Sequence, residues 1–214
     1  MPAINLDPTR TLIGYIVRHG ELNIENRWDG WGKYVLSSEG KESAEKAGQW
    51  LSFEHIGRIV TSDLPRALQT AEIVMGCCEC ACPFMATDPN LRAWAIGSFT
   101  GRKKTDEAKE EFKKFRDNPD LVHEGGESWN QMAERVKVAL QYLCTPYKGL
   151  PTVVVTHNSV IKGLLDLDEK GDVIDPGGII GVYLTQEGKC EFDVVMGATK
   201  LDVGSGMTID SSCG

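Results

Sequence analysis

The chain has 214 residues, of which 41% are hydrophobic and 25% are charged, an ordinary composition for a globular protein. Its 31 acidic side chains outnumber the 23 basic ones, so the formal net charge is −8. This charge excludes general binding to nucleic acids or to anionic membranes, which need a basic surface. We expect no signal peptide and no membrane span. The seven cysteines, an odd number, favour reduced thiols and a cytoplasmic location.

Short apolar runs rich in β-branched residues alternate with stretches of helical spacing. Strands are predicted at residues 11–17, 58–61, 152–156, 178–184 and 190–195. Because strands and helices alternate, the sequence predicts an α/β fold with helices on both faces of the sheet. No internal repeat or linker divides the chain, so a single domain over residues 1–214 is expected.

The helices are predicted from apolar spacing and from residues that favour helix ends. They cover residues 38–50, with Ser38 as the N-cap, and a stretch that begins at Pro65 and runs through Val74. Residues 103–116 form a charged helix and residues 129–143 a longer one with a buried face.

Four cysteines gather in one short segment, at Cys77, Cys78, Cys80 and Cys82. A metal site is one interpretation, and a loop that leads into a buried strand is the other. The segment lacks the paired C-x₂-C spacing of zinc sites, and adjacent cysteines ligate one ion poorly. The loop and strand are therefore favoured.

Candidate catalytic residues follow three of the predicted strands. Arg18 and His19 come directly after residues 11–17, Arg66 comes shortly after residues 58–61, and His157 follows residues 152–156. In open α/β sheets, ligands bind at the carboxyl ends of the strands. We therefore expect these four side chains to meet at one edge of the sheet.

Two arginines and two histidines are suited to a phosphoryl group. Arginine presents a planar fork of donors that fits phosphate oxygens and stays charged. A neutral imidazole can attack phosphorus and form a covalent intermediate, and a second imidazole can donate a hydrogen bond to an oxygen. The pattern thus predicts a phosphate-handling enzyme with a histidine nucleophile.

Several motifs, in order along the chain, resemble those of the histidine phosphatase superfamily, the phosphoglycerate mutase-like proteins. They are Arg18-His19-Gly20-Glu21, the loop at residues 23–31, Leu36-Ser37-Ser38-Glu39-Gly40, residues 62–71, Gly125-Gly126-Glu127-Ser128 and Val155-Thr156-His157. The resemblance spans roughly residues 12 to 185. It implies a three-layer α/β/α sandwich with a mostly parallel central sheet.

The resemblance also implies roles for individual residues. His19 would become phosphohistidine, and Arg18, Arg66 and His157 would form the phosphate pocket. Further phosphate or substrate contacts would come from Asn23, Gly30 and Asn158. Only Leu22 separates Glu21 from Asn23, so this loop is shorter than is usual in the family. No metal or organic cofactor is implied, and the expected partner is a small phosphorylated substrate.

The chain departs from the family at the position of the general acid, where Ala93 stands in place of glutamate. Glu127 and Glu124 are the candidate substitutes, with Asp63 as a third. Alternatively, the substrate carries a leaving group that needs no proton. General acid catalysis typically contributes about 10²–10⁴-fold to a rate, so this loss matters.

Three functions remain open from the sequence. The leading hypothesis is a phosphatase that hydrolyses phosphate monoesters through phosphohistidine. The alternatives are a phosphoglycerate mutase-like phosphotransferase and a phosphate-binding pseudoenzyme. Residues 101–128 are expected to form a lid and the C-terminal residues a flexible tail. The oligomeric state is not readable, and a homodimer is one option.

Overall fold

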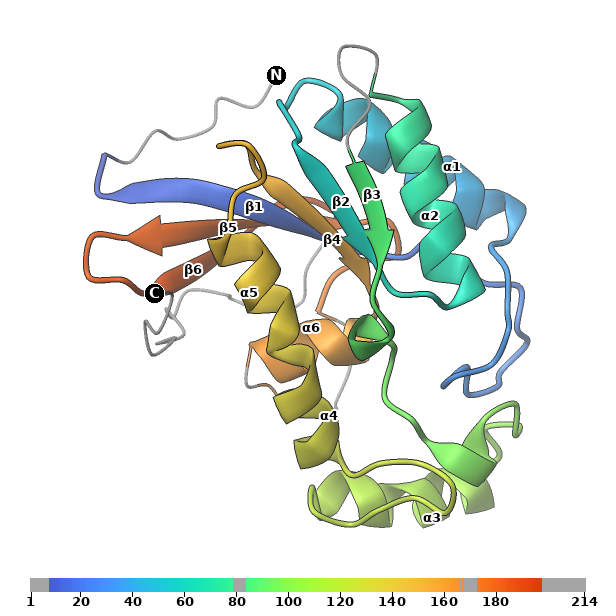
Figure 1. The fold of residues 1–214 in the computed structure, drawn as a ribbon. Helices are drawn as coiled ribbons and strands as arrows, with labels where there is room; N and C mark the ends of the chain where they lie inside the picture. Colours follow the sequence, from blue (N-terminus) through green and yellow to red (C-terminus); the bar gives the residue numbers. More distant parts are fainter. Residues whose placement is uncertain (1–7, 79–83, 166, 168–172, 198–214) are drawn as a thin grey trace.

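A computed structural model describes residues 8–78, 84–165, 167 and 173–197 of the chain. Within these residues, six strands form one sheet in the order β3-β2-β4-β1-β5-β6 (Figure 1). The strands are β1 (Arg10–Arg18), β2 (Arg58–Thr61), β3 (Phe84–Thr87), β4 (Thr152–Thr156), β5 (Ile179–Thr185) and β6 (Cys190–Met196).

The sheet is mostly parallel, as the sequence predicts. β4 lies between β1 and β2 and pairs with both in parallel, while β3 pairs in parallel with β2. β5 pairs antiparallel with β1 and with β6. The carboxyl ends of β1, β4 and β2 therefore lie side by side at one edge of the sheet.

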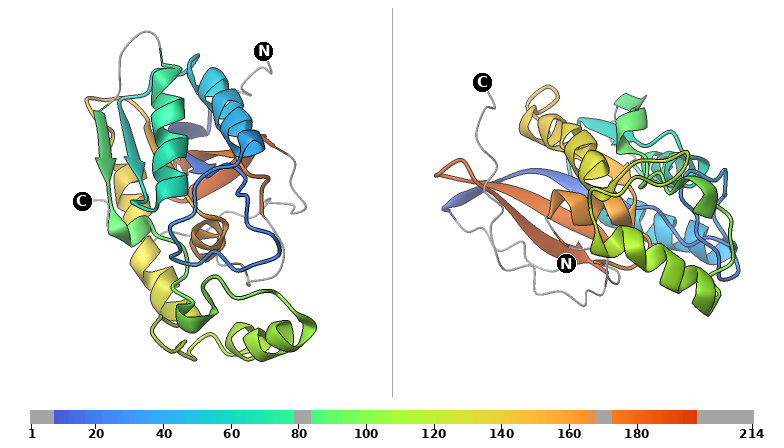
Figure 2. Two further views of the ribbon diagram at one scale, coloured as in Figure 1. Left: turned by 90° about the vertical axis from the view of Figure 1, so that its right-hand side faces the viewer. Right: turned by 90° about the horizontal axis from the view of Figure 1, so that it is seen from below.

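Helices cover both faces of the sheet (Figure 2). On one face lie α1 (Ser38–Leu51) and α2 (Pro65–Gly76), and on the other α4 (Trp129–Val136), α5 (Val138–Cys144) and α6 (Asn158–Leu164). The remaining helix, α3 (Asp106–Asp117), lies away from the sheet. Two short 3₁₀ helices, η1 (Pro89–Leu91) and η2 (Gly97–Phe99), follow β3.

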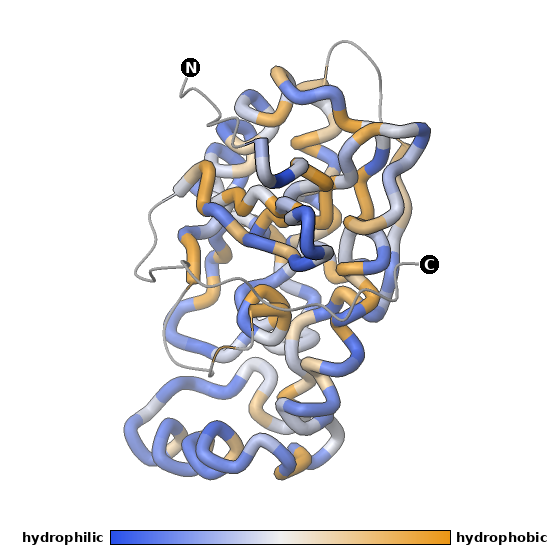
Figure 3. Tube along the Cα trace, turned by 90° about the vertical axis from the view of Figure 1, so that its left-hand side faces the viewer, coloured by the Kyte–Doolittle hydropathy of each residue, from blue (hydrophilic) through white to orange (hydrophobic). Residues whose placement is uncertain are grey.

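The two cores follow from the alternation of side chains along each strand. In β4, Val153 and Val155 pack with α1 and α2, whereas Val154 packs with the helices of the opposite face. β4 is buried along its whole length, as expected for a central strand with helices on both sides. Figure 3 shows these apolar segments inside the molecule and the largely hydrophilic α3 at its end.

The ends of three helices differ from the sequence prediction. The N-cap of α1 is Ser37 rather than Ser38, because the hydroxyl of Ser37 accepts a hydrogen bond from Gly40 N at 3.0 Å. Thr105 caps α3 in the same way, so this helix begins at Asp106 rather than at Lys103. The predicted helix over residues 129–143 is interrupted at Lys137, whose N–H bonds to Glu134 O, three residues back. α6 follows His157 directly and was not predicted.

Parts of two predictions lie outside the described residues. Cys80 and Cys82 fall there, as does the C-terminal tail beyond Gly197. Cys77 caps the C-terminus of α2 and Cys78 follows it, and the next strand, β3, is a half-exposed edge strand rather than a buried one. No helix in the described part of the chain is long and apolar enough to cross a membrane.

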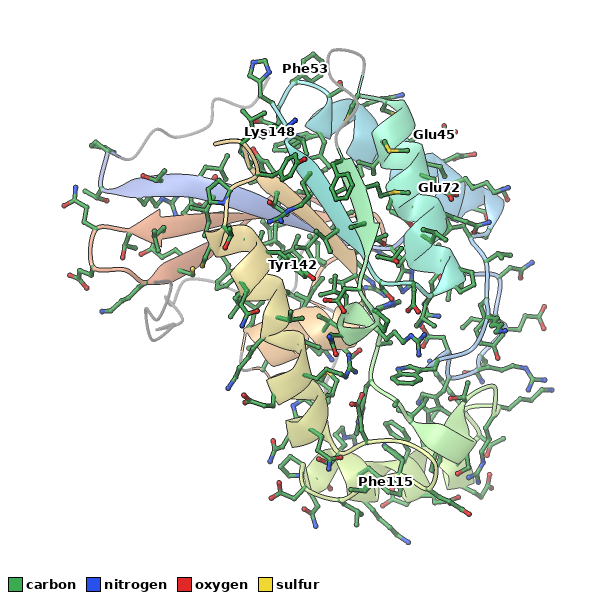
Figure 4. The ribbon with its side chains drawn as sticks, in the orientation of Figure 1. Glu45, Phe53, Glu72, Phe115, Tyr142 and Lys148 are labelled. Atoms are coloured by element: carbon green, nitrogen blue, oxygen red, sulfur yellow. The ribbon has the colours of Figure 1, made fainter. Side chains whose placement is uncertain are left out.

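An aromatic cluster holds α3 and its flanking loops against the rest of the molecule. Phe112 stacks on Trp28 with ring centroids 5.0 Å apart and contacts Trp94 edge to face. His123 stacks on Phe115 at 3.9 Å, and Figure 4 labels Phe115 on the side of α3. Residues 101–128 are thus anchored by side chains that lie beside the site described below. Their movement as a lid stays a prediction.

Replacing His123 with phenylalanine is expected to make the protein less sensitive to acid. His123 is buried, neither ring nitrogen has a hydrogen-bond partner among the described residues, and burial lowers its pKa to about 4. The unfolded chain, with a histidine pKa near 6.5, therefore binds the extra proton between about pH 6.5 and 4, and stability falls as the pH falls through this range.

The measurement is urea unfolding of both proteins at pH 7 and pH 5. The wild type should lose about 1–2 kcal/mol more than His123→Phe between these two pH values. An equal loss in both proteins would show that this imidazole is protonated in the folded state.

Candidate active site

The loop after β1 is fixed tightly against α1 and α2. His19 N donates to Thr156 O at 2.9 Å, and Gly20 N donates to the hydroxyl of Thr70 at 3.1 Å. A Cβ on Gly20 would lie 2.1 Å from Gly40 O, so only glycine fits between the loop and the first turn of α1. This packing places the imidazole of His19 at the carboxyl edge of the sheet.

Hydrogen bonds select one tautomer of His19. Its Nδ1 lies 2.7 Å from Gly20 O, which can only accept, so Nδ1 carries the proton. Nε2 then has a free electron pair, and Arg66 Nε donates toward it at 3.3 Å. The side chain is 6% exposed, so the unprotonated nitrogen is held in one orientation in a nearly buried position.

Arg66 lies in the first turn of α2, directly after Pro65, and is fully buried. Besides His19, its guanidinium donates to Gly30 O at 2.7 Å and to Gly32 O at 3.1 Å. Nη2 is also 3.2 Å from a carboxylate oxygen of Asp29. One buried cation therefore connects the loop at residues 29–32 to the imidazole of His19.

Both histidines of the site are neutral near pH 7. Burial and the positive charge of Arg66 lower the pKa of His19 to about 3, although Asp29 acts in the opposite direction. Burial and Arg66 also hold the pKa of His157 well below its usual value. A neutral His19 is the form that can attack an electrophile.

His157 follows β4 and lies beside His19, with ring centroids 5.0 Å apart. Its Nε2 is 2.9 Å from the hydroxyl of Ser62, while Nδ1 is buried without a hydrogen-bond partner in the described structure. If the Ser62 hydroxyl donates to Nε2, Nδ1 carries the proton and is a donor. With this tautomer, the two imidazoles combine an acceptor nitrogen, Nε2 of His19, with a donor nitrogen, Nδ1 of His157.

A cavity of about 710 Å³ opens over these side chains. Arg18, His19 and His157 line it, and Gly30 and Asn158 also contribute to its wall. The wall further contains Glu21, Ile24, Arg27, Trp28, Asp29, Ala93, Trp94, Ile96, Lys104, Phe112, Arg116, Ser159 and Lys162. Arg66 is fully buried and is not part of the wall, but it contacts three wall residues, His19, Gly30 and Asp29.

Two of the wall residues have structural hydrogen bonds as well. Arg18 donates from Nη1 to Ile174 O at 2.6 Å, and Asn158 Oδ1 accepts from Val173 N at 3.1 Å. These bonds hold the chain around residues 173–174 against the ends of β1 and β4.

Asn23, Glu124 and Glu127 do not reach the cavity. Asn23 and Glu124 are exposed and absent from its wall. Glu127 accepts hydrogen bonds from the guanidinium of Arg135 and from Ala95 N, so its carboxylate is fully engaged in supporting the segment around Ala95. The structure therefore separates these three residues from the histidines.

Asp63 is engaged in the same manner, through two hydrogen bonds from Arg92. Ala93, in contrast, lies in the wall of the cavity, where it offers no proton. Asp29 was not among the candidates predicted from the sequence, although its carboxylate contacts Arg66 within the site. Asp29 directly precedes Gly30 in the loop that was predicted to contact the substrate, and this position could have identified it as a site residue.

Comparisons with known proteins agree with this geometry. The sequence model of the histidine phosphatase superfamily (branch 1) matches residues 14–171. Phosphoglycerate mutase-like protein 4 of Arabidopsis thaliana is 34% identical over 159 residues, which are 71% of this chain and 68% of the relative. A metal-independent phosphoserine phosphatase of the same plant is 33% identical over 159 residues, covering 70% of this chain and 65% of the relative.

A solved structure supports the fold independently. The mycobacterial glucosyl-3-phosphoglycerate phosphatase in complex with VO3 superposes with a TM-score of 0.72 at 22% identity, over 89% of this chain and all of the other. At 22% identity, this similarity is evidence for the fold alone, which is a mixed α/β architecture. Together with the match over residues 14–171, it shows that the chain belongs to the histidine phosphatase superfamily, branch 1.

Proposed function

We propose that this protein hydrolyses phosphate monoesters through a phosphohistidine on His19. The observation that carries the proposal is the state of His19 Nε2: it is unprotonated, nearly buried and next to the guanidinium of Arg66. A phosphoryl group in the cavity would meet a nucleophile and a cation at the same place. The relative named as a metal-independent phosphoserine phosphatase supports this reaction class.

In the first step, the hydrogen bond from Arg66 Nε to His19 Nε2 breaks, and the electron pair of Nε2 attacks phosphorus. The bond from phosphorus to the leaving oxygen breaks. Arg18 and Arg66 stabilise the charge on the equatorial oxygens, and His157 Nδ1 donates a hydrogen bond to one of them. The leaving group takes the electron pair of the broken bond. In the second step, water attacks the same phosphorus, the bond from phosphorus to Nε2 breaks, and inorganic phosphate leaves.

Hydrolysis of p-nitrophenyl phosphate tests the proposal. The wild type should release p-nitrophenolate, and a His19→Asn variant should not exceed the background rate. If the wild type binds vanadate or phosphate but turns over no activated ester, the protein is a phosphate-binding pseudoenzyme and the proposal is wrong. A cytoplasmic location stays a prediction from the odd number of cysteines in the sequence.

Introducing glutamate at Ala93 is expected to increase the hydrolysis of alkyl phosphates. Ala93 lies in the cavity wall, and the two carboxylates that line the described cavity belong to Glu21 and Asp29. Without an acid beside the leaving oxygen, the wild type should cleave aryl phosphates much faster than alkyl phosphates. Ala93→Glu should raise kcat/KM for an alkyl phosphate at least about tenfold and leave the aryl phosphate nearly unchanged.

Ala93→Gln is the matched control, because it adds similar volume without a titratable proton. If the wild type already cleaves both classes equally well, a proton donor is present and the leaving-group account is wrong.

The basic residues of the cavity wall favour substrates with a second acidic group. Arg27, Lys104 and Arg116 line the cavity together with the aromatic rings of Trp28 and Phe112. The overall charge of −8 repels anions, so these cations supply local attraction. The relative named as a phosphoserine phosphatase acts on a phosphate that carries a carboxylate, and we extend this substrate class to the present chain.

Replacing Arg116 with glutamine should raise KM for phosphoserine about two- to fivefold, the effect of one partly exposed charge pair. KM for p-nitrophenyl phosphate, which has no second acid, should not change. Lys114→Gln on the exposed side of α3 is the control. Equal effects of the two variants on phosphoserine would mean that only the general charge of α3 matters.

A mutase reaction is the second candidate, because relatives carry that name. Transfer of the phosphoryl group between positions of a phosphoglycerate would show it directly. Trp94 and Ile96 line the cavity beside Ala93 and offer no charged group to hold a phosphoglycerate there, so we expect hydrolysis to exceed transfer.

A further inference from the structure

Asp29 brings a carboxylate into the site that no motif assigned. It lines the cavity, its side chain is 37% exposed, and one of its oxygens lies 3.2 Å from Arg66 Nη2. The same guanidinium contacts His19 Nε2 through Nε. The carboxylate and the nucleophilic nitrogen are therefore held by two nitrogens of one planar, buried group.

The loop that carries Asp29 packs against the segment that contains Ala93. The next residue, Gly30, packs so closely on Ile96 that an added Cβ would lie 2.7 Å from Ile96 Cγ1. The indole nitrogen of Trp31 donates to Ala93 O at 2.7 Å. Residues 30 and 31 are thus joined to the segment 93–96, and both Asp29 and Ala93 line the cavity.

The other acidic side chains considered are unsuitable. Glu127 and Asp63 are each bound to an arginine outside the cavity, and Glu124 is exposed away from it. Glu21 lines the cavity, but it is exposed, and among the described residues its carboxylate forms no ion pair with the arginines or histidines of the site. Asp29 is the carboxylate that shares a cation with His19.

The charge state of Asp29 limits what it can do. Burial acts to raise the pKa of this carboxyl, but the Arg66 guanidinium outweighs burial, and the pKa lies below its usual value. The carboxylate is therefore ionised near neutral pH. It can accept a proton from water, but it has none to give to a leaving group.

We infer that Asp29 is the general base for the second half of the reaction, the hydrolysis of the phosphohistidine; this inference rests on the proposed function. A water molecule between Asp29 and the phosphoryl group gives a proton to the carboxylate while its oxygen bonds to phosphorus. The bond from phosphorus to His19 Nε2 breaks, and its electron pair returns to the nitrogen. Phosphate leaves, and the carboxylate then releases its proton to solvent.

In this mechanism, Asp29 acts in only one of the two half-reactions. Formation of the phosphohistidine has no acid and depends on the leaving group, whereas its hydrolysis has a base. Loss of Asp29 should therefore slow the second step and spare the first.

Rapid-mixing kinetics with p-nitrophenyl phosphate test this separation. The Asp29→Asn variant should release about one p-nitrophenolate per site in a burst and then turn over about 10²-fold or more slowly than the wild type. Because kcat/KM reports the first irreversible step, it should be kept or rise. Phosphoenzyme should accumulate, and formate, a small external base, should partly restore the steady rate.

Two further variants secure the interpretation. Glu25→Gln removes a negative charge from an exposed position of the same loop, outside the cavity wall, and should behave as the wild type. Asp29→Ser, with a melting temperature measured alongside, should reproduce the Asp29→Asn kinetics if folding is intact. The binding of vanadate by both Asp29 variants reports an intact phosphate pocket.

Other outcomes would overturn the inference. A fall in kcat/KM without a burst would place Asp29 in the first step. Unchanged kinetics would show that Asp29 has no role in the reaction. A faster turnover with tighter vanadate binding would show that its carboxylate competes with phosphate for Arg66. If the wild type forms no phosphoenzyme and hydrolyses nothing, the proposed function fails first, and the inference fails with it.

Discussion

Replacing His19 with asparagine is expected to lower kcat for p-nitrophenyl phosphate by about 10³-fold or more. Asparagine preserves polarity and approximate size, but it has no nitrogen with a free electron pair to attack phosphorus. Losses of this order are typical when the nucleophile of a covalent mechanism is removed. The measurement is initial-rate kinetics at saturating substrate.

His55→Asn serves as the control, because His55 is exposed and absent from the cavity wall. It should retain the wild-type rate. Binding of vanadate by His19→Asn, followed by competition with phosphate, establishes that the phosphate pocket is intact. A loss of less than tenfold in this variant would assign the attack to another group.

The second large effect is expected for Arg66→Lys, which keeps the positive charge and removes the fork of donors. Arg66 donates to His19, Gly30 and Gly32 from separate nitrogens, and an ammonium group cannot reach all three in that geometry. We expect kcat/KM to fall about 10²–10³-fold, as when one preorganised donor to the transition state is lost.

Stability should fall as well, because buried carbonyls of the loop at residues 29–32 lose their donors, at about 1–3 kcal/mol for each one left unsatisfied. Arg92→Lys is the matched control, since Arg92 pairs with Asp63 outside the cavity. If Arg66→Lys retained wild-type kcat/KM, the fork would have no part in catalysis.

The general location of the site follows from the sequence for a simple physical reason. Parallel strands place their carboxyl ends at one edge, so residues that follow β1, β2 and β4 are brought together whatever the details of packing. To predict that His19, Arg66 and His157 lie close together, it was enough to assign three short apolar runs as strands. Because the predicted strands match the observed ones, the structure brings these three side chains together as expected.

Side-chain partners could not be predicted in that way. Glu127 binds Arg135, eight residues later, and Asn23 points into solvent from a shortened loop. Both outcomes depend on the course of the loops, which local spacing does not determine. The same holds for Asp29, whose contact with Arg66 joins two segments separated by a helix and a strand.

The exact ends of helices are also difficult to predict from the sequence. Ser37 and Ser38 are equally good caps by residue type, and the choice between them depends on which hydroxyl meets Gly40 N. α6 was missed because only seven residues separate His157 from Leu165, too few for a periodic pattern to stand out.

Trapping of the phosphoenzyme tests the central claim most directly. The wild type, mixed with a ³²P-labelled aryl phosphate and quenched in alkali, should carry a label that resists alkali, is released by mild acid and maps to the peptide containing residue 19. His19→Asn should carry none. A label on a serine or aspartate, or equal labelling of both proteins, would contradict the account.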